Sequence, residues 1–161
     1  MSAGFRIGQG VDAHRLVAGR PLRLGGVEIA HDRGLEGHSD GDVLLHAVAS
    51  ALLGALGQGD LGTHFPPSDP ALEGIDSGEI LTRVVGRVSA GEYAIGNVDA
   101  TVVAQEPRLG AHLEKMRRAL ADRLKTDPER VNVKVTSTDH LGTIGRGECI
   151  AAFAVALLEP S

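Results

Sequence analysis

The chain has 161 residues with 16 basic and 21 acidic side chains, a length that suits one domain with its own core. A net charge of -5 and 2% aromatic residues disfavour nucleic-acid binding, and the single cysteine excludes an intramolecular disulfide. No apolar run approaches the ~18 residues of a membrane span, and the N-terminus has no signal-peptide pattern. We therefore expect residues 1–161 to form one soluble, cytoplasmic domain that binds neither membrane nor nucleic acid.

Apolar periodicity predicts strands near both ends of the chain and helices between them. In chain order the elements are strands at 5–14 and 21–29, helices at 42–56 and 77–90, a strand at 97–105, a helix at 111–125, and strands at 131–138 and 149–158. This order is typical of the α+β class. The simplest such architecture is a two-layer sandwich, in which one mixed sheet carries its helices on a single face.

The last predicted strand, CIAAFAVALL at 149–158, is apolar on both of its faces. Helices in a two-layer domain cover only one face of the sheet, so the other face needs a second cover. Burial against copies of the same chain supplies one, and we therefore expect a homo-oligomer.

Asp12 and His14 lie two residues apart in a predicted strand, where alternate side chains share a face. With His46, one turn inside the helix at 42–56, they offer the three ligands of a catalytic zinc site that keeps a fourth position open. The apolar surroundings of His46 support this interpretation, as does Asp42, which is placed to accept the second N–H of His46. The alternative is a turn aspartate with two unrelated surface histidines.

Ser39 and Asp42 have the spacing of a capping box at the start of that helix. His38 precedes the cap, where free backbone N–H groups favour an anion, although a plain surface histidine is the simpler interpretation. The other histidines show no ligand spacing and are expected to be solvated or locally hydrogen-bonded: His31, His64, His112 and His140. We expect Cys149 to be buried and inert.

The run TSTD at 136–139 ends a predicted strand and leads into the glycine-rich loop LGTIGRG. Hydroxyl groups suit phosphate oxygens and a carboxylate beside phosphates suits Mg²⁺; an ordinary turn is the alternative. The stretch GDLGTHFPPSDP at 59–70 is too rich in glycine and proline for regular structure and predicts a lid loop. Asp60 in this loop is either a ligand for polyol hydroxyls or a turn aspartate.

Seven motifs follow one another over residues 5–158: RIGQGVDAH, LGG, HSDGDVLLHA, GDLGTHFPPSDP, GNVDATVVAQEPRL, VNVKVTSTD and LGTIGRGE. In this combination the chain resembles the 2-C-methyl-D-erythritol 2,4-cyclodiphosphate synthase family. The resemblance implies a phosphorus-oxygen lyase of the non-mevalonate route to isoprenoids. In the implied reaction the 2-phosphate of 4-diphosphocytidyl-2-C-methyl-D-erythritol 2-phosphate attacks the β-phosphorus of its own diphosphate, which gives a cyclic diphosphate and CMP.

The resemblance also implies a homotrimer, with helices outside, sheets facing the threefold axis and active sites between subunits. It places zinc on Asp12, His14 and His46, and a second divalent metal, Mg²⁺ or Mn²⁺, on Asp139. Asp139 stands where the family often has Glu, and its side chain is one methylene shorter. Some family members bind an isoprenoid diphosphate near the trimer axis, where Arg146 lies in the motif.

His38 and Ser137 match family positions that hold the phosphates as charge develops, and we expect them to be the catalytic residues. The segments at 104–110 and 136–139 match the nucleotide side of the site and should come from a neighbouring subunit. Substrate contacts are implied for Asp12, His14, His38, Ser39, Asp60, Leu61, Gly62, Phe65, Asp69, Ala104, Pro107, Arg108, Leu109, Gly110, Thr136, Ser137, Thr138, Asp139, Thr143 and Arg146.

Two other functions fit the residues without the resemblance. Two histidines and one carboxylate also suit a non-haem Fe(II) oxygenase, although those enzymes usually carry the ligands on a double-stranded β-barrel rather than on a helix. A trimeric module that binds nucleotides or isoprenoid phosphates without turnover is the third reading.

Overall fold

The computed structural model describes residues 4–161, so the first three residues of the predicted domain lie outside the described part. Five strands form a mixed sheet in the order β4-β1-β7-β5-β6. Only β5 and β6 run parallel; the other neighbours are antiparallel. The strand bounds are β1 Arg6–Ala18, β4 Arg33–Leu35, β5 Tyr93–Val103, β6 Val131–Thr136 and β7 Cys149–Pro160. This confirms the predicted α+β class with one main mixed sheet.

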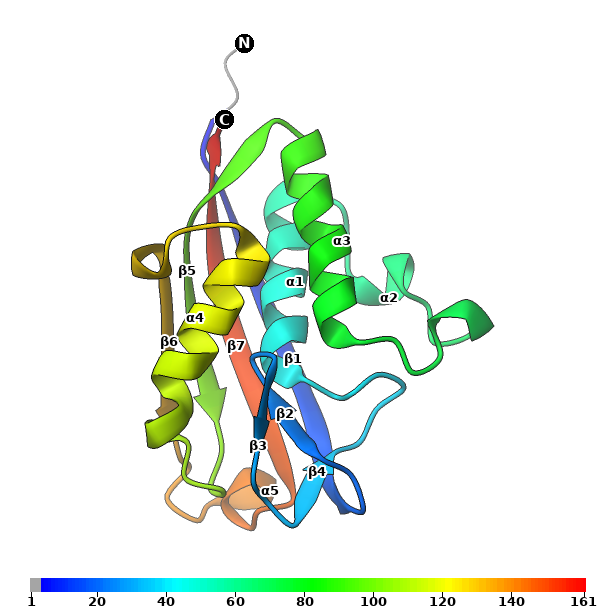
Figure 1. The fold of residues 1–161 in the computed structure, drawn as a ribbon, viewed down its shortest axis with the longest axis vertical. Coiled ribbons are helices and arrows are strands. Elements are labelled where there is room, and N and C mark those ends of the chain that lie inside the picture. Colours follow the sequence, from blue (N-terminus) through cyan, green and yellow to red (C-terminus); the bar gives the residue numbers. More distant parts are fainter. Residues whose placement is uncertain (1–3) are drawn as a thin grey trace.

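Three long helices lie on the same face of this sheet (Figure 1). They are α1 Val43–Leu56, α3 Ser77–Ala90 and α4 Leu113–Leu124. Helix α1 packs on β1 and β7, α4 packs on β6, and α3 packs on α1. Shorter helical segments are α2 Leu61–His64, α5 Gly142–Gly145 and 3-10 turns at Pro70–Leu72, Gly110–His112 and Pro128–Arg130. No helix in residues 4–161 combines the length and the hydropathy needed to cross a membrane.

The strand predicted at 21–29 is wrong as a single element, because it folds into a two-stranded hairpin apart from the main sheet. Its strands are β2 Leu22–Leu24 and β3 Val27–Ile29. Gly25 and Gly26 turn the chain with φ of 62° and 76°, and positive φ at both turn residues is the signature of a tight hairpin. The structure also adds the three-residue strand β4, which sequence periodicity did not predict.

Helix α1 and strand β1 make direct backbone contact at two glycines. A Cβ atom on Gly8 would lie 1.9 Å from the carbonyl oxygen of Ala51, and one on Gly10 would lie 1.9 Å from that of Ala47. Only residues without a side chain allow this approach. The contact holds the first turns of α1, including His46, against the strand that carries Asp12 and His14.

The other face of the sheet, here called the outer face, carries an exposed apolar strip along β1 and β7. Its members are Ile7 at 72% exposure, Val11 at 52%, Phe153 at 44% and Val155 at 47%. Val11 and Phe153 are cross-strand neighbours. The prediction that the last strand is apolar on both faces is therefore confirmed, and the helices leave this strip uncovered.

Candidate functional site

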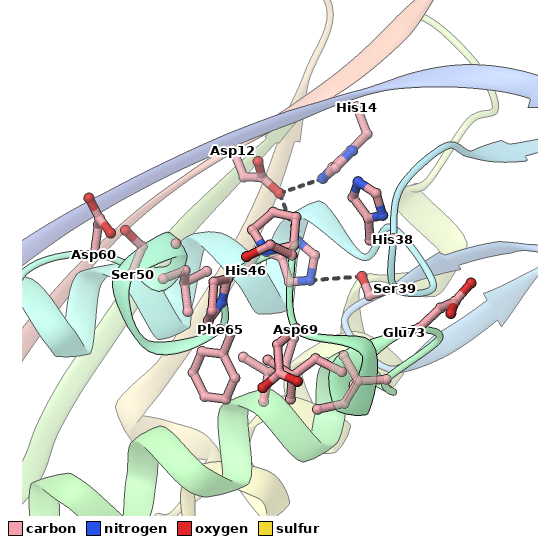
Figure 2. Close-up of a pocket in the computed structure, with 18 of the residues that line it drawn as sticks. Asp12, His14, His38, Ser39, His46, Ser50, Asp60, Phe65, Asp69 and Glu73 are labelled. Atoms are coloured by element: carbon pink, nitrogen blue, oxygen red, sulfur yellow. Dashed lines mark hydrogen bonds and ion pairs between the residues drawn. The ribbon is translucent and has the colours of Figure 1, made fainter.

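A cavity of about 650 Å³ opens beside the start of α1 (Figure 2). Strand β1 forms one wall, the chain that leads into α1 forms another, and the segment from α2 to Ile75 closes the third side. Ten of the 21 residues implicated by sequence line this cavity: Asp12, His14, His38, Ser39, His46, Asp60, Leu61, Gly62, Phe65 and Asp69. The fold therefore brings together side chains from segments that are far apart in the chain.

The centre of the cavity wall is a cluster of Asp12, His14 and His46. Asp12 Oδ2 lies 3.0 Å from His14 Nε2 and 2.9 Å from His46 Nδ1, and one ligand atom from each residue lies within 4.8 Å of the others. Two imidazole nitrogens and one carboxylate oxygen around a single point form a donor set that suits a divalent transition metal. The predicted convergence of these three residues is confirmed, and the cluster could hold a metal ion.

The local electrostatics prepare Asp12 as an anionic ligand. Burial by itself would raise its pKa, but hydrogen bonds from His14 and His46 and the charges of these rings lower it from 3.8 to about 2. The same contact with Asp12 raises the pKa of His14. At neutral pH the carboxylate is therefore ionised and faces both imidazoles.

Asp42 begins helix α1, but it does so differently from the prediction. It is the N-cap residue itself, with a fully buried side chain whose Oδ1 accepts from the backbone N–H of Leu45 at 3.1 Å. Its oxygens also accept from Gly25 N at 2.9 Å and Gly26 N at 2.8 Å, which ties the β2–β3 turn to the helix start. The predicted capping box with Ser39 and the predicted bond to His46 are both wrong, because these backbone donors occupy the carboxylate. Burial raises the pKa of Asp42 against the lowering effect of these bonds.

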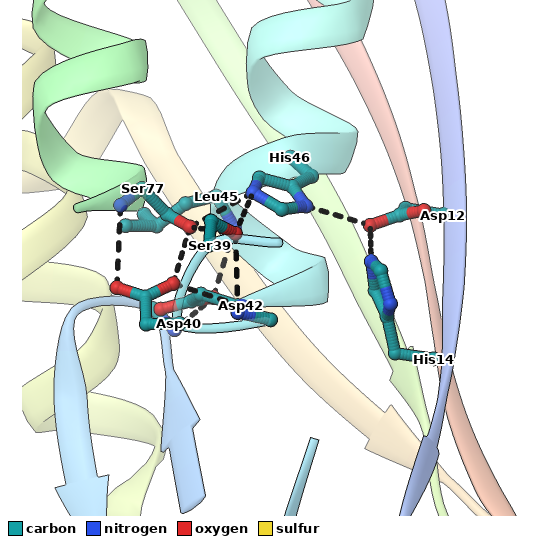
Figure 3. Close-up of polar contacts among 10 residues, drawn as sticks. Asp12, His14, Ser39, Asp40, Asp42, Leu45, His46 and Ser77 are labelled. Carbon is teal, nitrogen blue, oxygen red and sulfur yellow. Dashed lines mark hydrogen bonds and ion pairs between the residues drawn. The ribbon is translucent and has the colours of Figure 1, made fainter. Parts of the chain in front are cut away.

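The second ring nitrogen of His46 meets two hydroxyl groups instead (Figure 3). His46 Nε2 lies 2.8 Å from Ser77 Oγ and 3.2 Å from Ser39 Oγ. Ser77 is fully buried at the start of α3 and in turn contacts the carboxylate of Asp40 through both its hydroxyl and its backbone N–H. The sequence reasoning missed Ser77 and Asp40, since they lie 37 residues apart and share no motif.

The predicted lid loop at 59–70 contains more regular structure than expected. Asp60 caps the short helix α2 by accepting from Thr63 N at 2.8 Å, and these contacts with Thr63 lower its pKa. Asp69 caps the next 3-10 turn in the same way through Ala71 N at 2.9 Å. Just after this loop, the backbone N–H of Gly74 donates to the carbonyl oxygen of His38 at 2.9 Å. This bond joins the end of the loop region to the chain that leads into α1. Both aspartates thus have a structural role while they line the cavity.

The other eleven predicted site residues lie outside this cavity. In the described part of the chain they follow the ends of β5 and β6, near α5: Ala104, Pro107, Arg108, Leu109, Gly110, Thr136, Ser137, Thr138, Asp139, Thr143 and Arg146. Ala104 and Leu109 are buried, whereas Ser137 and Asp139 are exposed. Asp139 has a φ of 51°, and its backbone N–H donates to Ser137 Oγ at 3.3 Å. A single copy of the chain therefore presents the predicted site as two separate groups.

The residues expected to be inert behave only in part as predicted. His64 Nε2 bonds locally with the carbonyl oxygen of Gln58 at 2.7 Å, as expected. His31 differs from the prediction, because its Nε2 is buried and has no hydrogen-bond partner among the described residues, although the Asp32 carboxylate lies 3.4 Å away. Cys149 is only partly buried, with Sγ 3.5 Å from Thr143 Oγ1, so the expectation of full burial is wrong.

Comparison with known proteins matches this geometry to one family. A relative from Geotalea daltonii named 2-C-methyl-D-erythritol 2,4-cyclodiphosphate synthase is 58% identical over 155 residues, covering 96% of this chain and 91% of the relative. A solved structure of IspF from Plasmodium falciparum in complex with CDP has a TM-score of 0.88 at 34% identity and covers 100% of this chain and 99% of its own. The bifunctional IspDF of Campylobacter jejuni has a TM-score of 0.93 at 38% identity, and the match covers 98% of this chain and 42% of that one. Residues 5–159 match the model of the YgbB family, and the chain therefore belongs to that family.

Proposed function

We propose that this chain is a cyclase with the activity of its curated relatives, converting 4-diphosphocytidyl-2-C-methyl-D-erythritol 2-phosphate into 2-C-methyl-D-erythritol 2,4-cyclodiphosphate and CMP. In this reaction an oxygen of the 2-phosphate forms a bond to the β-phosphorus. The bond from that phosphorus to the CMP oxygen breaks, and CMP leaves with the electron pair. The reaction is a step of the non-mevalonate isoprenoid pathway, and the observation that carries the proposal is the Asp12, His14 and His46 cluster in the wall of the cavity.

The cluster fits a zinc ion by the chemistry of its donors. Asp12 is ionised at neutral pH, His14 and His46 direct ring nitrogens toward it, and three protein ligands leave room for a substrate oxygen. When bound there, zinc withdraws charge from a phosphoryl oxygen and so weakens the repulsion between the two phosphate groups. We assign Asp12, His14 and His46 as the residues that hold it.

The remaining work of this chain is to select the folded-back conformation of the substrate. His38 and Ser39, which precede α1, line the cavity and are suited to donate hydrogen bonds to phosphate oxygens. Across the cavity, Asp60 to Gly62 and Phe65 also line the wall. In this proposal Asp60 to Gly62 contact the methylerythritol hydroxyls, and Phe65 shields that side from water. Both reacting groups belong to one molecule, so positioning supplies most of the rate and no protein nucleophile is needed.

The nucleotide half of the site is proposed to come from a neighbouring subunit of a homotrimer. Ser137 and Asp139 lie outside the cavity and are exposed, and the apolar strip on the outer face needs a cover. In this arrangement Ser137 holds a phosphate oxygen, and Asp139 helps to bind a second metal, Mg²⁺ or Mn²⁺. The segment from Ala104 to Gly110 is proposed to recognise cytosine, in keeping with the CDP complex of the Plasmodium falciparum relative.

Phosphorus NMR of the product, together with CMP release, tests the reaction. We expect both phosphorus atoms of the non-nucleotide product in a cyclic diphosphate and one CMP released for each product molecule. Oxygen uptake with bound iron, or binding of the substrate without turnover, contradicts the proposal.

Complementation between two variants tests the shared site. His46→Ala lacks the zinc side and Ser137→Ala lacks the nucleotide side, so each variant alone should be nearly inactive. If trimers form at random from an equal mixture, each mixed trimer contains one intact site, and about a quarter of the wild-type activity should return. A mixture that stays as inactive as its components contradicts a site built from two subunits.

A further inference from the structure

The feature that carries a further inference is the pair of groups behind His46. On the cavity side, His46 Nδ1 faces Asp12; on the far side, Nε2 lies 2.8 Å from the hydroxyl oxygen of Ser77. The His46 side chain is 12% exposed and Ser77 is fully buried, so water does not compete freely for this contact. Figure 3 shows a continuous line of contacts from Asp12 through His46 and Ser77 to Asp40.

The direction of these hydrogen bonds follows from the chemistry of the groups. An ionised carboxylate only accepts hydrogen bonds, and Asp40 accepts from Ser77 N at 3.2 Å, from Asp42 N at 3.1 Å and from the Ser77 hydroxyl. The single hydroxyl proton of Ser77 is therefore committed to Asp40. The oxygen of Ser77 keeps its lone pairs, so toward His46 it can only accept.

An acceptor at Nε2 requires that His46 carry its proton on that nitrogen. Nδ1 faces the Asp12 carboxylate at 2.9 Å, so it donates to Asp12 in the metal-free chain; a metal bound at the cluster would take the place of that proton, and the lone pair of Nδ1 would then face the metal. A histidine that binds a metal commonly donates its other N–H to a protein acceptor, which fixes both the tautomer and the plane of the ring. Here that acceptor is a serine on a different helix, oriented by a third residue.

We propose that Ser77 is a positioning residue for the metal centre: oriented by Asp40, it fixes His46 with its proton on Nε2 and its Nδ1 free to bind zinc. The inference rests on the metal site of the proposed function. It couples the start of α3 to the start of α1, because Ser77 is the first residue of α3 and Asp40 precedes α1.

Ser39 offers a second and weaker acceptor to the same nitrogen. Its Oγ lies 3.2 Å from His46 Nε2, against 2.8 Å for Ser77, and it also accepts from Gly41 N at 3.2 Å. No carboxylate among the described residues bonds to its hydroxyl, so Ser39 is free to act as donor or acceptor. We therefore expect Ser77 to matter more than Ser39 for zinc affinity.

The test measures zinc affinity of the full chain by competition with a chromophoric chelator. Ser77→Ala should weaken zinc binding by about 10- to 100-fold, the usual cost of losing a group that orients a metal ligand. Ser77→Thr keeps the hydroxyl and should restore most of the affinity, while Ser39→Ala should cost less than Ser77→Ala. Ser89→Ala is the matched control, since Ser89 is an exposed serine on the same helix and should bind zinc like the wild type.

Nitrogen NMR of the zinc-loaded protein reads the tautomer directly. In the wild type we expect a proton on His46 Nε2 that exchanges slowly with water, and in Ser77→Ala we expect that protection to be lost. If Ser77→Ala folds poorly, Asp40→Asn is the second variant, because it changes the group that orients the Ser77 hydroxyl. Its amide N–H can donate to Ser77, which frees the serine proton to turn toward His46, so zinc affinity should again fall.

The outcomes separate this inference from the proposed function. If folded Ser77→Ala binds zinc as tightly as the wild type, or if His46 carries its proton on Nδ1 in the zinc-loaded wild type, the role of Ser77 is refuted while the metal site stands. If the wild type itself binds no zinc, or binds it as tightly after His46→Ala, the metal site of the proposed function fails first.

Discussion

The cavity beside α1 and the segment from Thr136 to Arg146 contain similar residue types but differ in how far one subunit completes them. In the cavity, both ring nitrogens of His46 have partners within the chain, and the side chain is 12% exposed. In the other segment, Ser137 and Asp139 are exposed, and their mutual contact is a backbone N–H to a hydroxyl. Within residues 4–161, Arg146 pairs with its near neighbour Glu148 alone, at 2.8 Å.

This difference separates two ways to build a site. A metal centre needs donors fixed to a few tenths of an ångström, and packing between β1, α1 and α3 achieves this inside a single chain. A group that contacts only the far end of the substrate can be supplied by another copy, provided that the subunits assemble. We therefore expect substitutions in the cavity to change zinc binding and the stability of the fold. Substitutions on the outer face or between Thr136 and Arg146 should instead change assembly and binding of the second metal.

The largest expected effect is the loss of turnover in His46→Ala. Removal of one of three donors should release zinc, and the several kcal/mol of transition-state stabilisation that a metal supplies correspond to a decrease of about 10³-fold or more in rate. Metal analysis and CMP release on the same sample provide the measurement, and the trimer should persist. Wild-type activity in a preparation verified to be free of zinc would rule out this site assignment.

The next largest effect concerns the outer face, where we expect copies of the chain to assemble. Phe153→Asp places a charge in the apolar strip, and burying it against a neighbouring subunit costs several kcal/mol. We expect monomers with native circular dichroism and intact zinc binding. Their activity should fall at least tenfold, which is roughly what a free-energy cost above 1.4 kcal/mol implies. Light scattering gives the oligomeric state, and Lys115→Asp, at an exposed position on α4, is the control. Trimers of undiminished stability in Phe153→Asp would show that this strip is not the interface.

Asp42→Ala tests whether the position of α1, and with it the cavity, depends on contacts within one chain. The change leaves three backbone N–H groups without their acceptor and removes the cap of α1, which should lower the free energy of unfolding by about 3 kcal/mol. Urea unfolding at fixed subunit concentration measures it. If Asp42→Ala unfolds within 0.5 kcal/mol of the wild type, roughly the range of a neutral surface change, Asp42 does not hold the helix to the hairpin.

The acid dependence of stability tests the electrostatics of the cluster in metal-free protein. The folded-state pKa of Asp12 is lowered from 3.8 to about 2, so its contribution is fully present above pH 3.8 and is lost as the pH falls through 2. A shift of this size corresponds to about 2 kcal/mol at most. Unfolding measured between pH 5 and 2 in the presence of a chelator should show this loss in the wild type but not in Asp12→Asn. Parallel curves for the two proteins would contradict it.

The smallest effect concerns the second metal. Asp139 is exposed, and its side chain is one methylene shorter than that of Glu. Asp139→Glu should lower the Mg²⁺ concentration for half-maximal CMP release by a few-fold, about 1 kcal/mol or less. Asp139→Ala should raise it. Identical Mg²⁺ titrations for all three proteins would remove Asp139 from the metal site.

The sequence predicted the cluster of Asp12, His14 and His46 because its signals are local. Asp12 and His14 share a strand face by alternation, and His46 lies in an apolar helix where a free imidazole is costly. Strands β1, β5, β6 and β7 and the three long helices were predicted from similarly local apolar patterns, whereas the three-residue β4 was not. The cluster then required only that α1 pack on β1.

Most of the errors arose where tertiary contacts decide the outcome. One error is local: the apolar alternation changes phase at Gly25 and Gly26, from Leu22 and Leu24 to Val27 and Ile29, and a single strand at 21–29 overlooks this turn signal. The other errors are tertiary. Asp42 has the spacing to reach His46, but the turn of that hairpin approaches it in space and occupies its oxygens. Ser77 could be found only by knowing that α3 begins beside His46, and no spacing in the sequence encodes that.

The backbone contact at Gly8 and Gly10 has a consequence for how this protein can vary. His46 immediately precedes Ala47, whose carbonyl oxygen lies against Gly10, so the distance between helix and strand is also the distance between metal donors. Any side chain at Gly10 must push α1 away from Asp12 without altering a single ligand. In a mutational screen, substitutions at Gly10 should therefore reduce activity as strongly as substitutions at His14 and His46. Evolution must keep the missing side chain at Gly10 just as it keeps the two imidazoles.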